Sequence, residues 1–393
     1  MMHSPLLFAL GLVTSFASLS EAHTTFTTLF VDDVNQGDGT CIRMAKEGNL
    51  ATHPIAGGLD AEDMACGRDG QNAVAFSCPA PAGAKLTLEF REWADAAQPG
   101  SIDPSHVGPM AIYLKHVSDM QSDPAAGEGW FKIWAEGFDT AAGKWATEKL
   151  IDNNGLLSIN LPPGLPTGSY LARHEIITLQ NVTNDKTDAQ FYVGCAQLAV
   201  EGGTSDSPIP SDKTVSIPGH ISDPADPGLT FNVYTEDAST YKVVGPEVFF
   251  PGGGGGDANA RRQVQQRQNT PSGLVPPDCL VKNANWCASA LPKYSDETGC
   301  WAAADACWEQ LDECYESAPP SGSKGCKVWE EQMCTVVSDG CESGDVQGPP
   351  AAEGLGEDVN EPIPGGRLPD AVNGGGQAAK GRNRAQRAAE WYK

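Results

Sequence analysis

The sequence is poor in basic residues. Of its 393 residues, 26 are Lys or Arg and 51 are Asp or Glu, so the formal net charge is −25. This excess of carboxylates excludes a nucleic-acid partner, because a phosphate backbone binds to a basic face. It fits a protein that acts on an uncharged substrate. Beyond its start the chain also lacks an apolar run of the roughly 20 residues that a membrane helix needs, so we expect no membrane partner.

The start of the chain contains one short apolar segment with no basic residue in front of it. Residues 5–14 read P-L-L-F-A-L-G-L-V-T, which is too short to cross a bilayer and is typical of the hydrophobic region of a signal peptide. Ser20 and Ala22 place small residues at the positions that precede a cleavage site. We therefore predict a signal peptide over 1–22 and a secreted, extracellular protein that begins at His23.

The twelve cysteines are unevenly distributed. An even number in an exported chain predicts disulfides. Eight of the twelve lie in the short segment 278–342, and the sequence does not choose among their possible pairings. The other four are Cys41, Cys66, Cys78 and Cys195.

Residues 23–250 have the pattern of a β-rich domain. Residues 84–93, A-K-L-T-L-E-F-R-E-W, alternate apolar and polar side chains, which predicts a half-buried strand. Similar runs follow at 111–115, 129–134, 156–161, 169–179 and 189–200, separated by Gly, Pro, Asn and Asp. We see no alternation of helices and strands. The pattern predicts a mainly β protein with a sandwich of the immunoglobulin or fibronectin type.

The composition changes after residue 250. Residues 251–277 begin P-G-G-G-G-G-D and continue rich in Gln, which predicts a flexible linker. The eight-cysteine segment 278–342 predicts a small disulfide-rich, helical domain, because Cys300, Cys307 and Cys314 recur at intervals that share one helix face. Five of its aromatic residues could stack on sugars or fill a small core; they are Trp286, Trp301, Trp308, Trp329 and Tyr315. Residues 343–393 are rich in Gly and Pro, and we expect a disordered tail.

A histidine at the first position of a mature chain is an unusual metal ligand. It offers its α-amine and its ring Nδ1 in one chelate, and a second histidine would complete a three-nitrogen set that suits copper. The cleavage site alone favours the simpler alternative that His23 is an accidental first residue.

Several motifs occur in order across 23–250. They read H-T-T-F-T-T-L-F-V-D-D-V-N-Q-G-D-G, M-A-C-G-R-D-G, S-H-V-G-P-M-A-I-Y-L, G-W-F-K-I, R-H-E-I-I-T-L, D-A-Q-F-Y-V-G-C-A-Q-L and D-P-G-L-T-F-N-V-Y. With His23 at the cleavage point, this set resembles the fungal copper-dependent lytic polysaccharide monooxygenases of auxiliary-activity family nine. The eight-cysteine segment resembles a module appended to some of these enzymes.

The resemblance implies a copper site. His23 and His106 match its histidine ligands, Tyr192 matches its axial tyrosine, and Gln190 matches the glutamine that points at the oxygen. Gln190 and Tyr192 are two apart on an expected strand, so both can face the metal. Taken alone, His106 is more often a structural histidine and Tyr192 a core aromatic.

One position departs from the family pattern. Many members have a histidine that supports the oxygen site where this chain has Gln180. His174 has the same strand parity, so it either substitutes in part or is an ordinary core or surface residue. The sequon N-V-T predicts N-glycosylation of Asn181 beside the site.

The resemblance also implies further residues. Tyr241 matches an exposed aromatic that stacks on the glucan, with a plain loop tyrosine as the alternative. Cys66 and Cys195 match the family's disulfide, which leaves Cys41 and Cys78 for a second.

H-E-I-I-T begins like a zinc-protease motif, but a threonine stands where the second histidine must be. The remaining histidines of the domain are expected to be structural: His53, His116 and His220.

The implied activity is oxidative. A copper ion, reduced by an external donor such as ascorbate, a small phenol or a secreted dehydrogenase, would use O2 or H2O2 to cleave β-1,4-glucan, most simply cellulose, at C1 or C4. We expect a monomer. Two alternatives remain from the sequence: a non-catalytic copper- or glucan-binding wall protein, and a wall protein tethered by its C-terminal region.

Overall fold

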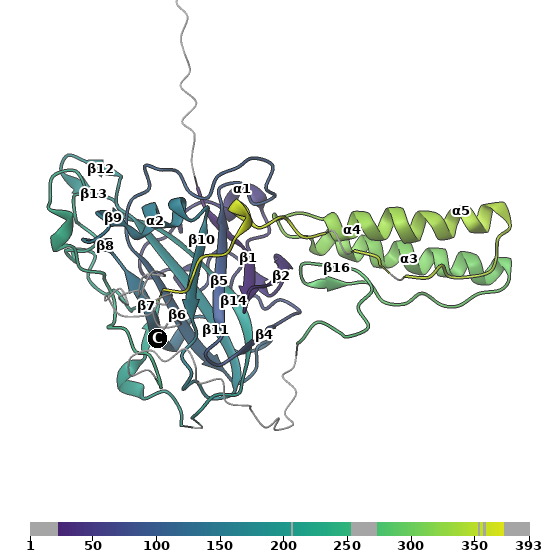
Figure 1. Ribbon diagram of the computed structural model, residues 1–393, viewed down its shortest axis with the longest axis horizontal. Helices are drawn as coiled ribbons and strands as arrows, with labels where there is room; N and C mark the ends of the chain where they lie inside the picture. The colour runs from purple at the N-terminus through teal and green to yellow at the C-terminus, as the bar shows by residue number, and fades with distance from the viewer. Residues whose placement is uncertain (1–22, 206, 253–272, 353, 357–358, 373–393) are drawn as a thin grey trace, which may run out of the picture.

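Two β-sheets pack face to face, and a small helical module projects from their side (Figure 1). The computed structural model describes residues 23–205, 207–252, 273–352, 354–356 and 359–372. The predicted signal peptide, most of the predicted linker and the end of the predicted tail lie outside these residues. Among the described helices, none has the length and apolar content to cross a membrane.

The smaller sheet has four strands and the larger has seven. In the order in which the strands pair, the smaller sheet consists of β10 (Leu156–Asn160), β5 (Lys85–Arg91), β1 (Thr25–Val31) and β2 (Val34–Asp38). The larger sheet runs β15 (Val215–Ile217), β7 (Gly127–Glu136), β6 (Met110–Val117), β11 (Gly168–Thr178), β14 (Gln190–Glu201) and β3 (Ile42–Arg43), and β4 (Cys78–Pro81) pairs with β14. Each of the six runs that the sequence analysis selected overlaps one of these strands, so the prediction of a mainly β sandwich is confirmed.

The remaining elements of the sandwich are short. They are β8 (Phe138–Asp139), β9 (Lys144–Trp145), β12 (Val182–Thr183), β13 (Lys186–Thr187), α1 (Gly48–Ala51), α2 (Ala146–Asp152), η1 (Glu62–Met64), η2 (Ser211–Lys213) and η3 (Ala238–Thr240). They lie in connections between the long strands. One apolar core fills the space between the two sheets, and a second lies under the loops that cover the outer face of the larger sheet.

The alternating strand β5 is not half-buried as predicted. Its apolar residues enter the core, but Thr87, Glu89 and Arg91 are buried as well. Arg91 donates to Glu89 and to Asp38 of β2, and the Thr87 hydroxyl lies 2.6 Å from that of Ser158. The polar face is therefore covered because its groups pair with each other across neighbouring strands, which no single-strand pattern reveals.

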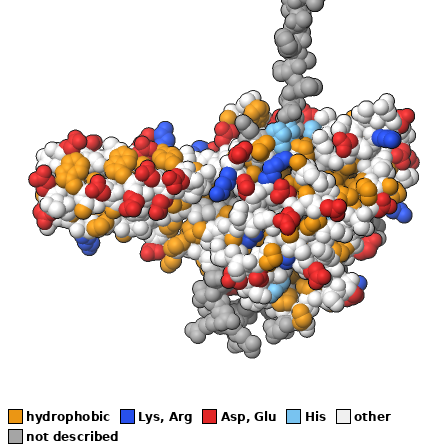
Figure 2. Space-filling model, turned by 180° about the vertical axis from the view of Figure 1, so that it is seen from behind, with side chains coloured by type: hydrophobic (Ala, Val, Ile, Leu, Met, Phe, Trp, Pro, Cys, Tyr) orange, Lys and Arg blue, Asp and Glu red, His pale blue; other side chains and the backbone are white. Residues whose placement is uncertain are grey.

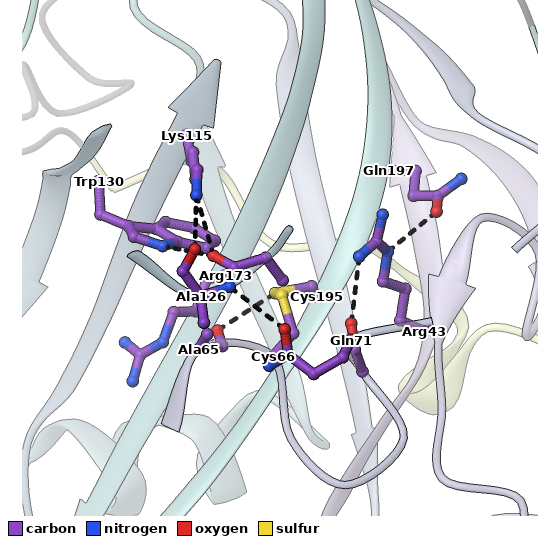
Figure 3. The surroundings of a disulfide bond; sticks show 12 residues. Arg43, Ala65, Cys66, Gln71, Lys115, Ala126, Trp130, Arg173, Cys195 and Gln197 are labelled. Atoms are coloured by element: carbon purple, nitrogen blue, oxygen red, sulfur yellow. Dashed lines mark hydrogen bonds between the residues drawn. A yellow bond between two sulfur atoms is a disulfide. The ribbon is translucent and has the colours of Figure 1, made fainter. Parts of the chain in front are cut away.

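Two disulfides join distant parts of the sandwich. Cys41 bonds to Cys78 and Cys66 to Cys195, the two pairs that the sequence analysis expected. Figure 3 shows the second bond beside two buried cations, Arg43 and Lys115. The Lys115 ammonium donates to three backbone carbonyls and Arg43 donates to Gln197, so both buried charges have acceptors.

The eight-cysteine module is a helical arm, as expected. It contains β16 (Lys282–Asn283), β17 (Trp286–Cys287), α3 (Glu297–Ser317), α4 (Lys324–Trp329), the π-helical turn η4 (Glu330–Cys334) and α5 (Thr335–Ser343). The seven-residue spacing on α3 places its cysteines toward the other helices. The bonds are Cys300–Cys341, Cys307–Cys334 and Cys314–Cys326, with Cys279–Cys287 in the hairpin.

The module packs directly on the sandwich. Asn285 donates to the Gly39 carbonyl at 2.8 Å and accepts from the Cys41 amide at 2.9 Å, and Lys282 donates to the Gln36 carbonyl. Gly39 has a φ of +69°, and a Cβ there would lie 2.7 Å from Pro319 of the module, so this contact requires glycine. The module is therefore held by more than its linker.

The segment that follows the module returns to the sandwich. We expected disorder from 343 onward, but Lys324 pairs with Glu361, Lys85 donates to the Pro369 carbonyl at 3.2 Å, and Val372 forms a parallel bridge with Ile159 of the edge strand β10. A short turn, η5 (Pro364–Gly366), lies on this path. The segment is ordered there because an open sheet edge supplies backbone partners, which composition does not show.

Candidate active site

His106 and Tyr192 lie against each other at one end of the larger sheet. Tyr192 is a buried residue of β14, and His106 belongs to the loop before β6. The Nε2 atom of His106 lies 3.0 Å from the Tyr192 hydroxyl, and the rings meet edge to face. The His106 amide donates to the Asp103 carbonyl, and Ser105 Oγ lies 3.2 Å from Nδ1, so a tight turn sets the direction of the ring.

The same environment favours neutral forms of both groups. Burial lowers the pKa of His106, the Asp103 carboxylate opposes this, and His23 lowers it further. Burial raises the pKa of the Tyr192 hydroxyl. A neutral imidazole keeps a ring-nitrogen lone pair that can bind a metal, and a neutral phenol adds no negative charge to the site.

His23 lies beside this pair, immediately before β1. Its ring centroid is 6.4 Å from that of Tyr192 and 3.9 Å from that of His53, on which it stacks. The Thr24 amide donates to the Thr52 carbonyl at 3.1 Å, which brings the loop containing His53 next to the start of β1. We expected His53 to be a structural histidine; the structure places it at the site.

Two glutamines extend the cluster. Gln190 Oε1 accepts from Gln180 Nε2 at 3.0 Å and from the Tyr192 hydroxyl at 3.4 Å. Gln180 follows the end of β11, whose Thr178 pairs with Gln190 of β14. The antiparallel register therefore joins four predicted site residues into one chain of polar contacts: Gln180, Gln190, Tyr192 and His106.

The donors at this site fit copper better than most metals. Among the described residues, no group of three or more His, Cys, Asp or Glu side chains is arranged to hold a metal. A metal here would need a donor of another kind, and the α-amine that cleavage before His23 would release is such a donor. Nitrogen donors with few carboxylates suit copper rather than calcium or magnesium.

His174 lies away from the glutamines. It is 3% exposed and its ring meets Phe26 and Phe90 edge to face, with centroid distances of 5.5 and 4.9 Å. It faces Gly194 across the strand pair, where a Cβ would lie 2.7 Å from the ring. His174 is therefore a core histidine between the sheets, packed against two phenylalanine rings and Gly194 rather than beside the glutamines, where a substitute would have to act.

Acid should destabilise the fold through His174. Burial, with a smaller effect of Arg173, lowers its pKa from 6.5 to about 3, and Glu175 opposes this. Below pH 6.5 the unfolded chain binds a proton there that the folded chain does not, so the free energy of unfolding should fall by up to about 1.4 kcal/mol per pH unit. We expect His174→Leu to have a shallower slope between pH 6.5 and 5 in urea unfolding. An unchanged slope would contradict this account.

Tyr241 does not occupy the position that we expected. It is mostly buried, with its ring edge to face against Trp145 and Phe231, and its hydroxyl donates to the Gly228 carbonyl at 3.1 Å. Burial raises its pKa. The exposed tyrosine of this region is Tyr234, 67% exposed, whose hydroxyl donates to the Gln180 carbonyl at 3.0 Å. Both are loop tyrosines in the sequence, and only packing distinguishes them.

Asn181 lies next to the site, as the sequence order requires. It is exposed just before the β12–β13 hairpin, and its Nδ2 donates to Asp188 at 3.1 Å. An exposed sequon beside Gln180 is accessible to glycosylation, and the modification stays a prediction.

Comparison with known proteins decides the family. The family described as Auxiliary Activity family 9 (formerly GH61) matches residues 23–241. The chain belongs to auxiliary activity family 9. It is similar to family 9 lytic polysaccharide monooxygenase C of Aspergillus tamarii, at 46% identity over 88% of this chain and 91% of that protein. It is also 45% identical to monooxygenase H of Botryotinia fuckeliana, over 88% of this chain and 78% of that one.

A solved family 9 structure shows the same fold. The protein named CvAA9A is 33% identical and aligns with a TM-score of 0.51 over 58% of this chain and 98% of its own. These matches confirm the resemblance seen in the sequence. The protein is an oxidoreductase, a lytic polysaccharide monooxygenase, and this family 9 enzyme carries its helical module in addition to the shared sandwich.

Proposed function

We propose that this family 9 enzyme binds one copper ion through His23, His106 and Tyr192 and cleaves β-1,4-glucan, most simply cellulose, at C1 or C4. The observation that supports the proposal is the approach of His106 Nε2 to the Tyr192 hydroxyl at 3.0 Å, with the His23 ring beside them. Three residues far apart in the sequence thus lie together, and burial favours the neutral forms of His106 and Tyr192.

The contacts of each site residue suggest its role in the proposed reaction. Bound copper supplies one-electron chemistry with O2 or H2O2, drawing electrons from an external donor such as ascorbate, a small phenol or a secreted dehydrogenase. His106 would present its Nε2 from a fixed turn, and His23 its amine and ring from the start of β1. Tyr192 would contribute its hydroxyl from its buried position on β14, next to His106. Gln190 already accepts a hydrogen bond from the Tyr192 hydroxyl, and its amide NH2 is the group that would donate to the oxygen co-substrate.

The cellular setting belongs to the same proposal. Cleavage after Ala22 would release the α-amine of His23. We propose that the enzyme is secreted and acts outside the cell as a monomer. The sandwich at 23–250, the linker at 251–277, the module at 278–342 and the tail at 343–393 remain our domain assignment, with the return path of the tail added by the structure.

Gln190→Leu should slow oxidation without removing the metal. The variant keeps the approximate volume of the side chain. It loses the Oε1 atom that accepts from Gln180 and Tyr192 and the amide NH2 that we propose as a donor. We expect product formation on cellulose to fall about 10²-fold, while copper affinity stays within about threefold. The measurement is the initial rate with ascorbate together with a copper titration. Gln121→Leu, at an exposed glutamine of another loop, is the control, and equal rates for the two variants would contradict the role of Gln190.

The test of the proposal uses the mature protein loaded with copper. It is incubated with amorphous cellulose, with and without ascorbate, and the products are read by mass spectrometry. Oligosaccharides oxidised at one end that appear only with ascorbate are expected, and the oxidised end gives the C1 or C4 position. Absence of such products on cellulose, xyloglucan and xylan despite tight copper binding would overturn the substrate assignment.

A further inference from the structure

The helix α3 carries a row of exposed aromatic rings. Trp301, Trp308 and Tyr315 are 38%, 38% and 42% exposed, whereas Trp286 and Trp329 fill the core of the module. The three exposed residues are seven apart, so they lie on one side of the helix at steps of about 10.5 Å. We call them the aromatic row. The core needs the other two rings, and it does not account for these three.

Two rings of the aromatic row are held in place. Trp308 Nε1 donates to Ser338 Oγ of α5 at 3.0 Å, and the Tyr315 hydroxyl donates to Glu330 of η4 at 2.6 Å. The disulfides Cys307–Cys334 and Cys314–Cys326 fix α3 against the same neighbours. Rings that are already ordered lose little conformational entropy when a ligand stacks on them.

Carboxylates accompany the rings. Asp305 and Asp312 are exposed and stand four residues after Trp301 and Trp308, which places each beside a ring on the helix surface. Figure 2 shows hydrophobic groups along this arm separated by acidic side chains. Such a surface repels acidic polymers and also a second copy of this chain, whose net charge is −25. It suits a neutral ligand whose hydroxyls donate to carboxylates.

We propose that the aromatic row binds one extended chain of neutral, β-1,4-linked sugars. In such a chain every second ring presents the same face, and a step of about 10.5 Å along the helix corresponds to two sugar rings. Each aromatic ring would stack on every second sugar, and the aspartates would accept from hydroxyls at the ring edge. The contacts of Asn285 and Lys282 with the sandwich hold the row at a fixed place relative to the enzyme. The inference does not depend on the copper site.

The test is a binding measurement on the full mature chain, stripped of copper and without reductant, so that the proposed oxidation plays no part. Depletion from solution is measured on microcrystalline cellulose and, separately, on β-chitin. We expect binding to one or both, weakened about tenfold by Trp301→Ala or Trp308→Ala and at least 30-fold by the triple variant with Tyr315→Ala. Preference for cellulose or chitin then identifies the sugar.

Charge variants separate recognition from folding. Asp305→Asn with Asp312→Asn should weaken binding several-fold, whereas Glu313→Gln, which removes a charge from another side of the same helix, should not. Tyr315→Phe keeps the ring, loses the bond to Glu330, and should retain most of the binding. Equal binding of the native protein and the triple variant, with the thermal unfolding of both unchanged, would overturn the proposal. So would a native dimer that the triple variant converts to a monomer in sedimentation, because the row would then be a self-association surface.

Discussion

His106→Ala is expected to abolish tight copper binding and oxidation. The variant removes one of the three nitrogen donors that we assign and leaves the Tyr192 hydroxyl without the neighbour that lies 3.0 Å from it. We expect copper affinity to fall at least about 10³-fold, equivalent to about 4 kcal/mol, and oxidised products to drop to background. Calorimetric titration and the electron paramagnetic resonance spectrum of Cu(II) measure the first effect, and mass spectrometry measures the second.

His116→Ala is the matched control. His116 is an exposed histidine of β6, paired with Tyr170 at the far end of β11 from the site. The His116→Ala variant should therefore have the copper affinity and product yield of the native protein. If His106→Ala binds copper as tightly as the native protein does, the metal lies elsewhere and the proposed site is wrong. Unfolding by heat must be compared in all three proteins, since a misfolded variant would lose copper for a different reason.

Among the variants proposed here, Glu175→Gln is expected to lower the free energy of unfolding most. Glu175 is 1% exposed; its Oε2 accepts from Arg173 at 2.7 Å and from His220 at 2.8 Å, and its Oε1 accepts from the Tyr113 hydroxyl at 3.3 Å. Burial acts to raise the pKa of Glu175, but Arg173 and His220 hold it well below its usual range. The carboxylate is therefore charged in the folded enzyme and is the counter-ion of a fully buried guanidinium.

Removing that charge while keeping the shape leaves Arg173 uncompensated in the core. Breaking a buried ion pair in this way costs about 3–5 kcal/mol, and urea unfolding of the mature enzyme measures it. Glu201→Gln is the control, since Glu201 is exposed at the end of β14, and it should change the free energy of unfolding by less than about 0.5 kcal/mol. A Glu175→Gln variant as stable as the control would show that Arg173 finds another partner.

This buried network illustrates what a single sequence can and cannot predict. The segment R-H-E-I-I-T-L predicted a strand correctly, and the strand is β11. The sequence did not indicate that Arg173 and Glu175, two apart on the strand, would be buried together against His220 from a distant loop. A charged pair in a strand is normally predicted to face solvent. Here the pair is buried because loops cover the outer face of the larger sheet, and the sequence of the strand does not show those loops.

The candidate site shows the same division. His23, His106, Gln190 and Tyr192 were named from ordered motifs, and the structure brings them together. His53 and Tyr234, which lie beside these residues, were not named as site residues, and Tyr241, which was named as exposed, is mostly buried. No pattern within the loops gives their direction: His53 reaches the site because Thr24 pairs with Thr52, and Tyr234 because its hydroxyl reaches the Gln180 carbonyl.

The sequence by itself predicted the strands, the helix α3 and the family, and it named the residues of the proposed copper site. Those features depend on local periodicity and on short motifs, which a chain displays without folding. Tertiary structure alone decided which aromatic rings of the module are exposed, that the module and the following segment pack on the sandwich, and that His174 is a core residue. Each of these depends on which surfaces meet across tens to hundreds of residues, and burial, unlike periodicity, is a property of both partners.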